Sequence, residues 1–188
     1  QAQGLGIGEV PDFWNLSHPE RVEHVARNYV DAGSRVVLTN TFRANGIAQA
    51  EHSDISRLSE VNRLGVEISR QAAGGRAAVF ASIGPSGKLL LTHGVDAECL
   101  RMAFDEQAQA LASAAPDAIV IETMTDLKEA EYAIAAARAT GLPVVACMVF
   151  DSGRAKDHTM MGVSPEEAAA ALTELGVDVV GANCGIGV

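Results

Sequence analysis

The chain has 188 residues, of which 48% are apolar and 20% charged, a composition typical of one globular domain with a buried core. Its 14 basic and 24 acidic residues give a net charge of -10, which argues against nucleic-acid binding because that binding depends on neutralising phosphates. No apolar run approaches the ~20 residues that a membrane-spanning helix needs, and no signal segment opens the sequence. The odd, sparse set of three cysteines is not a disulfide framework and favours a reducing, cytoplasmic location.

Short apolar runs alternate with helical stretches along the whole chain. A first helix opens at Ser17-His18-Pro19-Glu20 and ends at Gly33, with no strand before it. The expected strands are 35–39, 77–81, 118–121, 144–149 and 177–180, and the helices between them are 54–73, 96–114, 126–140 and 164–176. Each strand is almost continuously apolar, which is typical of parallel strands covered on both faces.

This order of elements predicts an α/β fold. A helix followed by five strand–helix repeats, the last without its helix, fits part of a (β/α)8 TIM barrel or a doubly wound sheet. A full barrel needs ~250 residues, so the chain would supply about strands two to six of eight. No linker or shift in composition divides the sequence, and we expect residues 1–188 to form one domain, truncated at both ends.

Polar residues follow the predicted strands at the points where the strands end. In a parallel barrel all these carboxyl ends open on one face, which is where barrel enzymes carry their chemistry. The segments are Thr39-Asn40-Thr41-Phe42, Ser82-Ile83-Gly84-Pro85-Ser86-Gly87, Glu122-Thr123-Met124-Thr125-Asp126, Asp151-Ser152-Gly153-Arg154 and Asn183-Cys184-Gly185. We therefore expect one thiol, several carboxylates and side-chain amides to meet at one mouth.

Two of these residues have more than one interpretation from the sequence alone. Glu122 ends an otherwise apolar strand, where a charge is costly unless it meets a partner. It either binds a ligand ammonium group or lies at the sheet rim and caps the next helix. Cys184 has no Cys or His close to it in sequence, which excludes a local zinc knuckle and leaves either a functional thiol or a small apolar residue.

The remaining candidate ligands give weaker signals. Cys147 lies within a predicted strand and Cys99 within a predicted helix, so both are expected to be structural. The histidines lack the i,i+4 spacing of a metal site and are expected at the surface or in caps; they are His18, His24, His52, His93 and His158. The glycines of 4–8 and 185–187 do not form a G-x-G-x-x-G between a strand and a helix, so they indicate nucleotide binding only weakly.

Five collinear segments resemble the homocysteine S-methyltransferase family. They are Glu9 to Pro19, Asp31-Ala32-Gly33 leading to Thr39-Asn40-Thr41-Phe42, Ser82 to Leu90, Glu122 to Asp126, and Gly181-Ala182-Asn183-Cys184-Gly185. Their order is that of the family, and together they cover nearly the whole chain. The segment from Ser82 to Leu90 is most similar to the homocysteine-binding domain of the cobalamin-dependent methionine synthase branch.

The resemblance implies a barrel enzyme in which zinc activates the thiol of homocysteine for methyl transfer, forming methionine. It implies that Cys184 is the first zinc ligand, that Glu122 binds the substrate amino group, and that Asn40, Thr41 and Asn183 line the pocket. The implied donor is methylcobalamin, fed by methyltetrahydrofolate, so corrinoid-binding and folate-binding modules are the expected partners. Betaine or S-methylmethionine is the alternative donor within the family.

The chain also departs from the family pattern. The Asp-Gly-rich first strand and the Gly-Gly-Cys-Cys segment after strand eight are absent, and Arg43 stands where a Gly is usual. With one protein thiolate, the chain alone is expected to bind zinc weakly and to be inactive, and its open edge strands are expected to aggregate or to pair with another copy. Two other functions stay open: a non-catalytic barrel remnant that binds a corrinoid partner, and an unrelated doubly wound nucleotide binder.

Overall fold

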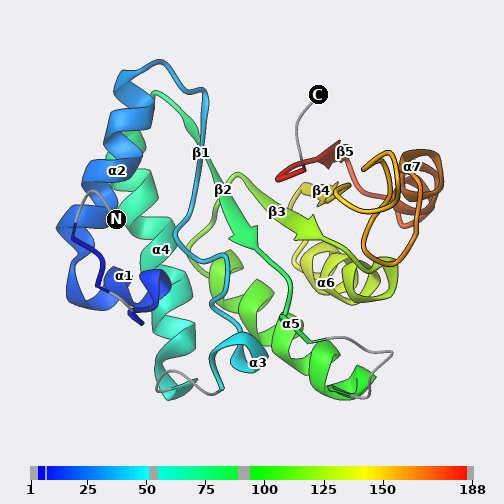
Figure 1. The fold of residues 1–188 in the computed structure, drawn as a ribbon. Helices are drawn as coiled ribbons and strands as arrows, with labels where there is room; N and C mark the ends of the chain where they lie inside the picture. Colours follow the sequence, from blue (N-terminus) through cyan, green and yellow to red (C-terminus); the bar gives the residue numbers. More distant parts are fainter. Residues whose placement is uncertain (1–3, 7, 51–54, 89–93, 186–188) are drawn as a thin grey trace.

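Five parallel strands form one sheet whose spatial order, β1-β2-β3-β4-β5, is the order of the chain (Figure 1). The structure is a computed structural model and describes residues 4–6, 8–50, 55–88 and 94–185. The strands are β1 (Val36–Leu38), β2 (Ala78–Ile83), β3 (Ala118–Met124), β4 (Val144–Met148) and β5 (Val179–Ala182). A doubly wound sheet reverses its strand order at a switch point, whereas this order never reverses among the described strands. The structure therefore confirms a partial barrel.

Helices cover the outer face of this sheet and follow the strands in turn (Figure 1). They are α1 (Trp14–Ser17), α2 (Pro19–Asp31), α3 (Gly46–Gln49), α4 (Leu58–Ala73), α5 (Ala97–Ala112), α6 (Leu127–Ala139) and α7 (Pro165–Glu174), with 3₁₀ turns η1 (Pro11–Phe13) and η2 (Ile55–Arg57). The predicted capping box of α7 is present, because Ser164 and Glu167 exchange hydrogen bonds. The predicted start of the second helix at Asp54 lies outside the described residues. The short helices α1 and α3 were not predicted, since four residues are too few to show a helical period.

The main core lies between the sheet and the helices. Val79, Ala81 and Ile83 of β2 are at most 1% exposed and belong to one cluster with Phe104 and Leu111 of α5. Successive strand residues point to opposite faces, so each strand contributes every second side chain to this outer core. The outer face is therefore packed as a finished layer, and it holds the strand ends at fixed positions.

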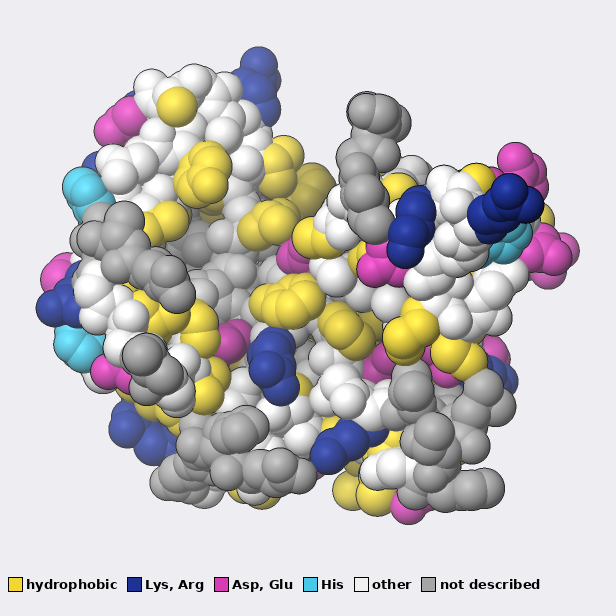
Figure 2. All heavy atoms as spheres, viewed as in Figure 1, with side chains coloured by type: hydrophobic (Ala, Val, Ile, Leu, Met, Phe, Trp, Pro, Cys, Tyr) yellow, Lys and Arg dark blue, Asp and Glu magenta, His cyan; other side chains and the backbone are white. Residues whose placement is uncertain are grey.

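The inner, concave face is open at both edges of the sheet. In β1 the outward-facing Val37 is 4% exposed, whereas Val36 and Leu38 on the concave side are 40% and 46% exposed. Val179 of β5 is 52% exposed at the opposite edge. Figure 2 shows hydrophobic side chains gathered in the hollow between the two ends of the sheet. The pairing of these edges with a second copy stays a prediction. In the part of the chain that the structure describes, no helix is long and apolar enough to cross a membrane.

The loop after β2 is fixed to its neighbours from two sides. Gly84 donates its N–H to the carbonyl of Phe42 at 2.8 Å. Ser86 donates both its N–H and its hydroxyl to Glu129 Oε1, at 2.7 and 2.6 Å. Glu129 belongs to the first turn of α6 and is 3% exposed. Burial raises the pKa of this carboxyl, and the two hydrogen bonds from Ser86 only partly oppose that effect.

The loop after β1 accommodates Arg43, which stands at a position where the resemblance leads us to expect Gly. Its N–H donates to the buried carboxylate of Asp12 at 3.0 Å, and its guanidinium donates to the carbonyl of Ala48 at 3.3 Å. Its backbone has no positive φ, so a side chain at this position introduces no strain.

Replacing Gly84 by Ala should destabilise the chain. A Cβ on Gly84 would lie 2.4 Å from Cε2 of Phe42, so the ring would have to move. We expect the free energy of unfolding in urea to fall by about 1–3 kcal/mol. Gly46→Ala is the matched control, because a Cβ there meets nothing within 4 Å and α3 gains a better helix former. Equal losses in the two variants would contradict this packing.

Replacing Glu129 by Gln should change how stability depends on pH. The pKa of Glu129 is raised above 4.5 in the folded chain, so folding favours the protonated carboxyl. The stability that this gives the folded chain is fully present below the unfolded pKa and is lost as pH rises through the folded pKa. The free energy of unfolding of the wild type, relative to Glu129→Gln, should therefore fall as pH rises from 4.5 through the folded pKa of Glu129. Urea unfolding of both proteins across that range measures the difference, and a rise with pH would refute it.

Candidate active site

The carboxyl ends of β2, β3 and β5 bring three polar side chains together. Glu122 accepts a hydrogen bond from the hydroxyl of Ser82 at 2.5 Å and another from Nδ2 of Asn183 at 2.9 Å. Ser82 pairs in register with Val120, and Glu122 lies two residues beyond Val120, so the two polar side chains share the concave face. The predicted convergence of a carboxylate and an amide at one mouth is present in the structure.

A β-bulge in β3 determines where Glu122 points. Ile121 pairs with Ala146 and Met124 pairs with Met148, so β3 carries one extra residue between these pairs. Thr123 absorbs the extra length with a left-handed backbone, φ 63°. Asn183 bridges across β4 to this turn, accepting the N–H of Thr123 on Oδ1 at 2.9 Å and donating from Nδ2 to its hydroxyl at 3.0 Å.

Cys184 lies beside the bulge at the end of β5. Its side chain is exposed, its backbone is left-handed with φ 55°, and the hydroxyl of Thr123 lies 3.9 Å from its sulfur. The next residue, Gly185, lies so close to the segment after β4 that a Cβ would be 2.9 Å from the carbonyl oxygen of Phe150. The chain therefore presents the thiol at the mouth within one residue of Asn183.

The described residues do not by themselves make up a zinc site. A zinc ion in a protein takes about four ligands from Cys, His, Asp or Glu. Cys184 is one sulfur donor, and no group of three or more such side chains that could hold a metal occurs in the described part of the chain. The thiol fits one position of the coordination that the resemblance implies, and the set as a whole does not fit.

The structure places Asn40 and Thr41 in a second network, after β1. Nδ2 of Asn40 donates to the carbonyl of Pro11 at 2.7 Å and to Oδ1 of Asn15 at 3.1 Å. Thr41 is fully buried and donates its hydroxyl to the carbonyl of Ser82 at 2.7 Å. The N–H of Ser82 donates to the hydroxyl of Thr39 at 2.9 Å. These hydrogen bonds hold the backbone of Ser82, whose hydroxyl in turn donates to Glu122. Thr41 therefore acts on Glu122 through Ser82.

Three residues of this arrangement carried no functional signal of their own in the sequence. Ser82 shows only its place at the end of a predicted strand, and its bond to Glu122 depends on the register of β2 with β3. Nothing in the residue types around Thr123 indicates a left-handed turn. Asn15, which donates to the carbonyls of Asn40 and Val61 at 2.8 and 3.0 Å, lies in a helix too short to be predicted.

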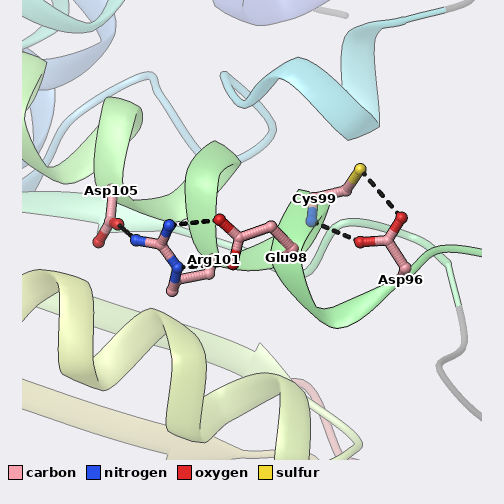
Figure 3. A network of polar contacts seen from close by, with 5 residues as sticks. All are labelled: Asp96, Glu98, Cys99, Arg101 and Asp105. Carbon is pink, nitrogen blue, oxygen red and sulfur yellow. Dashed lines mark hydrogen bonds and ion pairs between the residues drawn. The ribbon is translucent and has the colours of Figure 1, made fainter.

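The other two cysteines lie in environments that disfavour the thiolate. Cys147 of β4 is half-buried, and burial, followed by the charge of Glu122, raises its pKa. Cys99 lies exposed in the first turn of α5, where Asp96 accepts its N–H at 2.8 Å and its thiol at 3.3 Å (Figure 3). The hydrogen bond and charge of Asp96 raise the pKa of Cys99. Neither thiol is activated as a nucleophile.

The described histidines lie in local contacts of the kind expected for surface and capping residues. A ring nitrogen of His18 lies 2.8 Å from the hydroxyl of Ser17, one of His24 lies 3.2 Å from Nδ2 of Asn28, and Nδ1 of His158 lies 2.7 Å from Asp157. His52 and His93 lie outside the described residues.

Comparison with known proteins agrees with this geometry. The family model described as homocysteine S-methyltransferase matches residues 7–186. Methionine synthase of Mycobacterium tuberculosis is 27% identical over 194 residues, covering 97% of this chain and 16% of that protein. Betaine–homocysteine S-methyltransferase 1 of Danio rerio is 29% identical over 170 residues, covering 89% of this chain and 41% of that protein. The chain thus spans less than half the length of these relatives.

The fold is also similar to that of a solved enzyme structure. The metallated form of the homocysteine methyltransferase MmuM from Escherichia coli superposes with a TM-score of 0.81 at 21% identity, covering 97% of this chain and 70% of that one. This likeness supports the fold, and the family model, which matches nearly the whole chain, identifies the lineage. The chain belongs to the homocysteine S-methyltransferase family.

Proposed function

We propose that this chain forms the homocysteine-binding part of an enzyme that transfers a methyl group to the thiol of homocysteine and forms methionine. The observation that carries the proposal is the Glu122 carboxylate, held at the mouth by Ser82 and Asn183 beside the exposed thiol of Cys184. Homocysteine carries an ammonium group at one end and a thiol at the other. The Glu122 carboxylate is available for the ammonium group. The Cys184 thiol marks the side of the site at which the homocysteine thiol would lie.

The hydrogen-bond capacity of Glu122 suits an ammonium ligand. A carboxylate can accept about four hydrogen bonds, and Glu122 receives one on each oxygen from neutral donors of the chain. An ammonium group only donates, so it can use the remaining acceptor positions without displacing Ser82 or Asn183. Asn40 and Asn183, both half-buried, and Thr41, beneath Ser82, are proposed to shape the same pocket.

We also propose Cys184 as one zinc ligand of the complete enzyme. No group of three or more metal-binding side chains occurs among the described residues, so the proposal takes further ligands from elsewhere in the working protein. For the methyl donor, the match of the chain to a methionine synthase over 97% of its length supports methylcobalamin fed by methyltetrahydrofolate. Corrinoid-binding and folate-binding modules are then the partners, and a cytoplasmic location stays a prediction.

Two alternatives have specific support. Relatives named as betaine and S-methylmethionine enzymes match 89% and 92% of the chain, which supports either of those donors. A non-catalytic barrel remnant that binds a corrinoid partner is supported because no group of three or more metal-binding side chains occurs among the described residues. Only the remnant predicts that homocysteine does not bind, so ligand binding separates it from the enzymes.

Replacing Glu122 by Gln should weaken homocysteine binding. The substitution removes the charge that attracts the ammonium group, and a hydrogen bond to a charged group contributes about 1.5–3 kcal/mol, or roughly ten- to hundredfold in affinity. Titration calorimetry with homocysteine measures the change. 4-Mercaptobutanoate, which has the thiol and carboxylate but no amino group, should bind the wild type and Glu122→Gln alike. Glu174→Gln, at an exposed carboxyl at the end of α7, is the matched control.

The chain by itself should bind zinc weakly and fail to turn over. One thiolate provides far less than the about 10–16 kcal/mol reported for sites with four structural ligands. Competition against a chelator of known affinity measures the dissociation constant, and Cys184→Ser should reduce what binding there is. A tight site of one zinc per chain would refute the prediction.

A further inference from the structure

Two residues of the candidate site have backbone conformations that L-amino acids rarely adopt. Thr123 has φ 63° and Cys184 has φ 55°, and they are two of four non-glycine residues with positive φ in the described part of the chain. For a β-branched residue such as Thr this conformation is an outlier. Such a conformation persists only where the surrounding structure holds it in place.

Asn183 supplies the contacts that hold Thr123. The N–H of Thr123 can only donate, so the atom of Asn183 at 2.9 Å from it must be the amide oxygen. That fixes the orientation of the amide, and Nδ2 then donates to the Thr123 hydroxyl at 3.0 Å and to Glu122 Oε2 at 2.9 Å. Both hydrogens of Nδ2 are therefore used within β3. The backbone N–H of Asn183 donates to the carbonyl of Met148 at 3.2 Å, which anchors it to β4.

We propose that Asn183 is a positioning residue that acts on homocysteine through Glu122 and Thr123. Its side chain makes three hydrogen bonds to Glu122 and Thr123 at the β3 bulge, which we call the clasp. The clasp keeps the backbone of Thr123 left-handed and thereby sets the direction of the Glu122 carboxylate. Because Cys184 is the next residue, the same clasp fixes the thiol relative to that carboxylate. The effect of Asn183 on homocysteine binding rests on the proposed function, whereas the hydrogen bonds of the clasp do not. The side-chain amide of Asn183, which the resemblance implies lines the pocket, is directed at β3.

The first experiment tests the clasp without any ligand. Amide hydrogen exchange of the labelled chain is followed by NMR in the wild type and in Asn183→Ala. We expect exchange at Thr123 to accelerate at least about tenfold, because its N–H loses its acceptor, while exchange at Ile121 in the sheet ladder stays the same. Unchanged protection of Thr123 would overturn the proposal.

A second variant keeps the test available if Asn183→Ala does not fold. Glycine adopts positive φ without penalty, so Asn183→Ala/Thr123→Gly should hold the bulge without the clasp and recover the urea midpoint. Its affinity for homocysteine should still be about tenfold below that of the wild type, because Glu122 has lost an orienting hydrogen bond. Full recovery of affinity would overturn the proposal.

The third experiment separates positioning from direct contact. If Asn183 acts through Glu122, the loss of homocysteine affinity in Glu122→Gln/Asn183→Ala should be smaller than the sum of the losses in Glu122→Gln and Asn183→Ala. Losses that add in full would show that Asn183 acts independently of Glu122, and would overturn the proposal. Failure of the wild type to bind homocysteine would refute the proposed function, and the exchange rate of Thr123 would still decide the clasp.

Discussion

The Glu122 carboxylate lies at the end of an apolar strand, and the rest of the mouth is arranged around it. A charge in that position is costly unless hydrogen bonds replace the water that it loses. Ser82 on β2 and Asn183 after β5 supply those bonds from either side of β3. Each of these donors is in turn held by further contacts, so the position of one carboxylate depends on strands from across the sheet.

The support beneath Ser82 shows how far this dependence extends. Thr39 and Thr41, which follow β1, bond both the N–H and the carbonyl of Ser82. Gln107 of α5 donates to the carbonyl of Thr41 at 2.9 Å. Buried polar groups of this kind require partners, and the hydrogen bonds among Thr39, Thr41 and Ser82 supply them. The mouth is therefore fixed by the finished outer layer of the fold, while the concave face beside it is open at both edges of the sheet.

Much of the fold was predictable from the sequence because each buried parallel strand is a short apolar run, and runs such as 118–121 and 144–149 have few alternatives. The proximity of Glu122, Asn183 and Cys184 was predictable from their places at the carboxyl ends of parallel strands of one sheet. Their mutual contacts could not be predicted. The bond between Ser82 and Glu122 requires the register of two strands, and the turn at Thr123 requires a bulge that no residue type specifies.

The choice of threonine at the bulge indicates what the site needs. Glycine would adopt φ 63° without strain, so local backbone energetics alone would favour glycine at position 123. Threonine offers a hydroxyl, which accepts from Nδ2 of Asn183 and lies 3.9 Å from the sulfur of Cys184. The Thr123 hydroxyl thus lies between the Asn183 amide, which holds the Glu122 carboxylate, and the Cys184 thiol. The strain at Thr123 is explained if the distance between carboxylate and thiol has to be fixed before a ligand that spans both arrives.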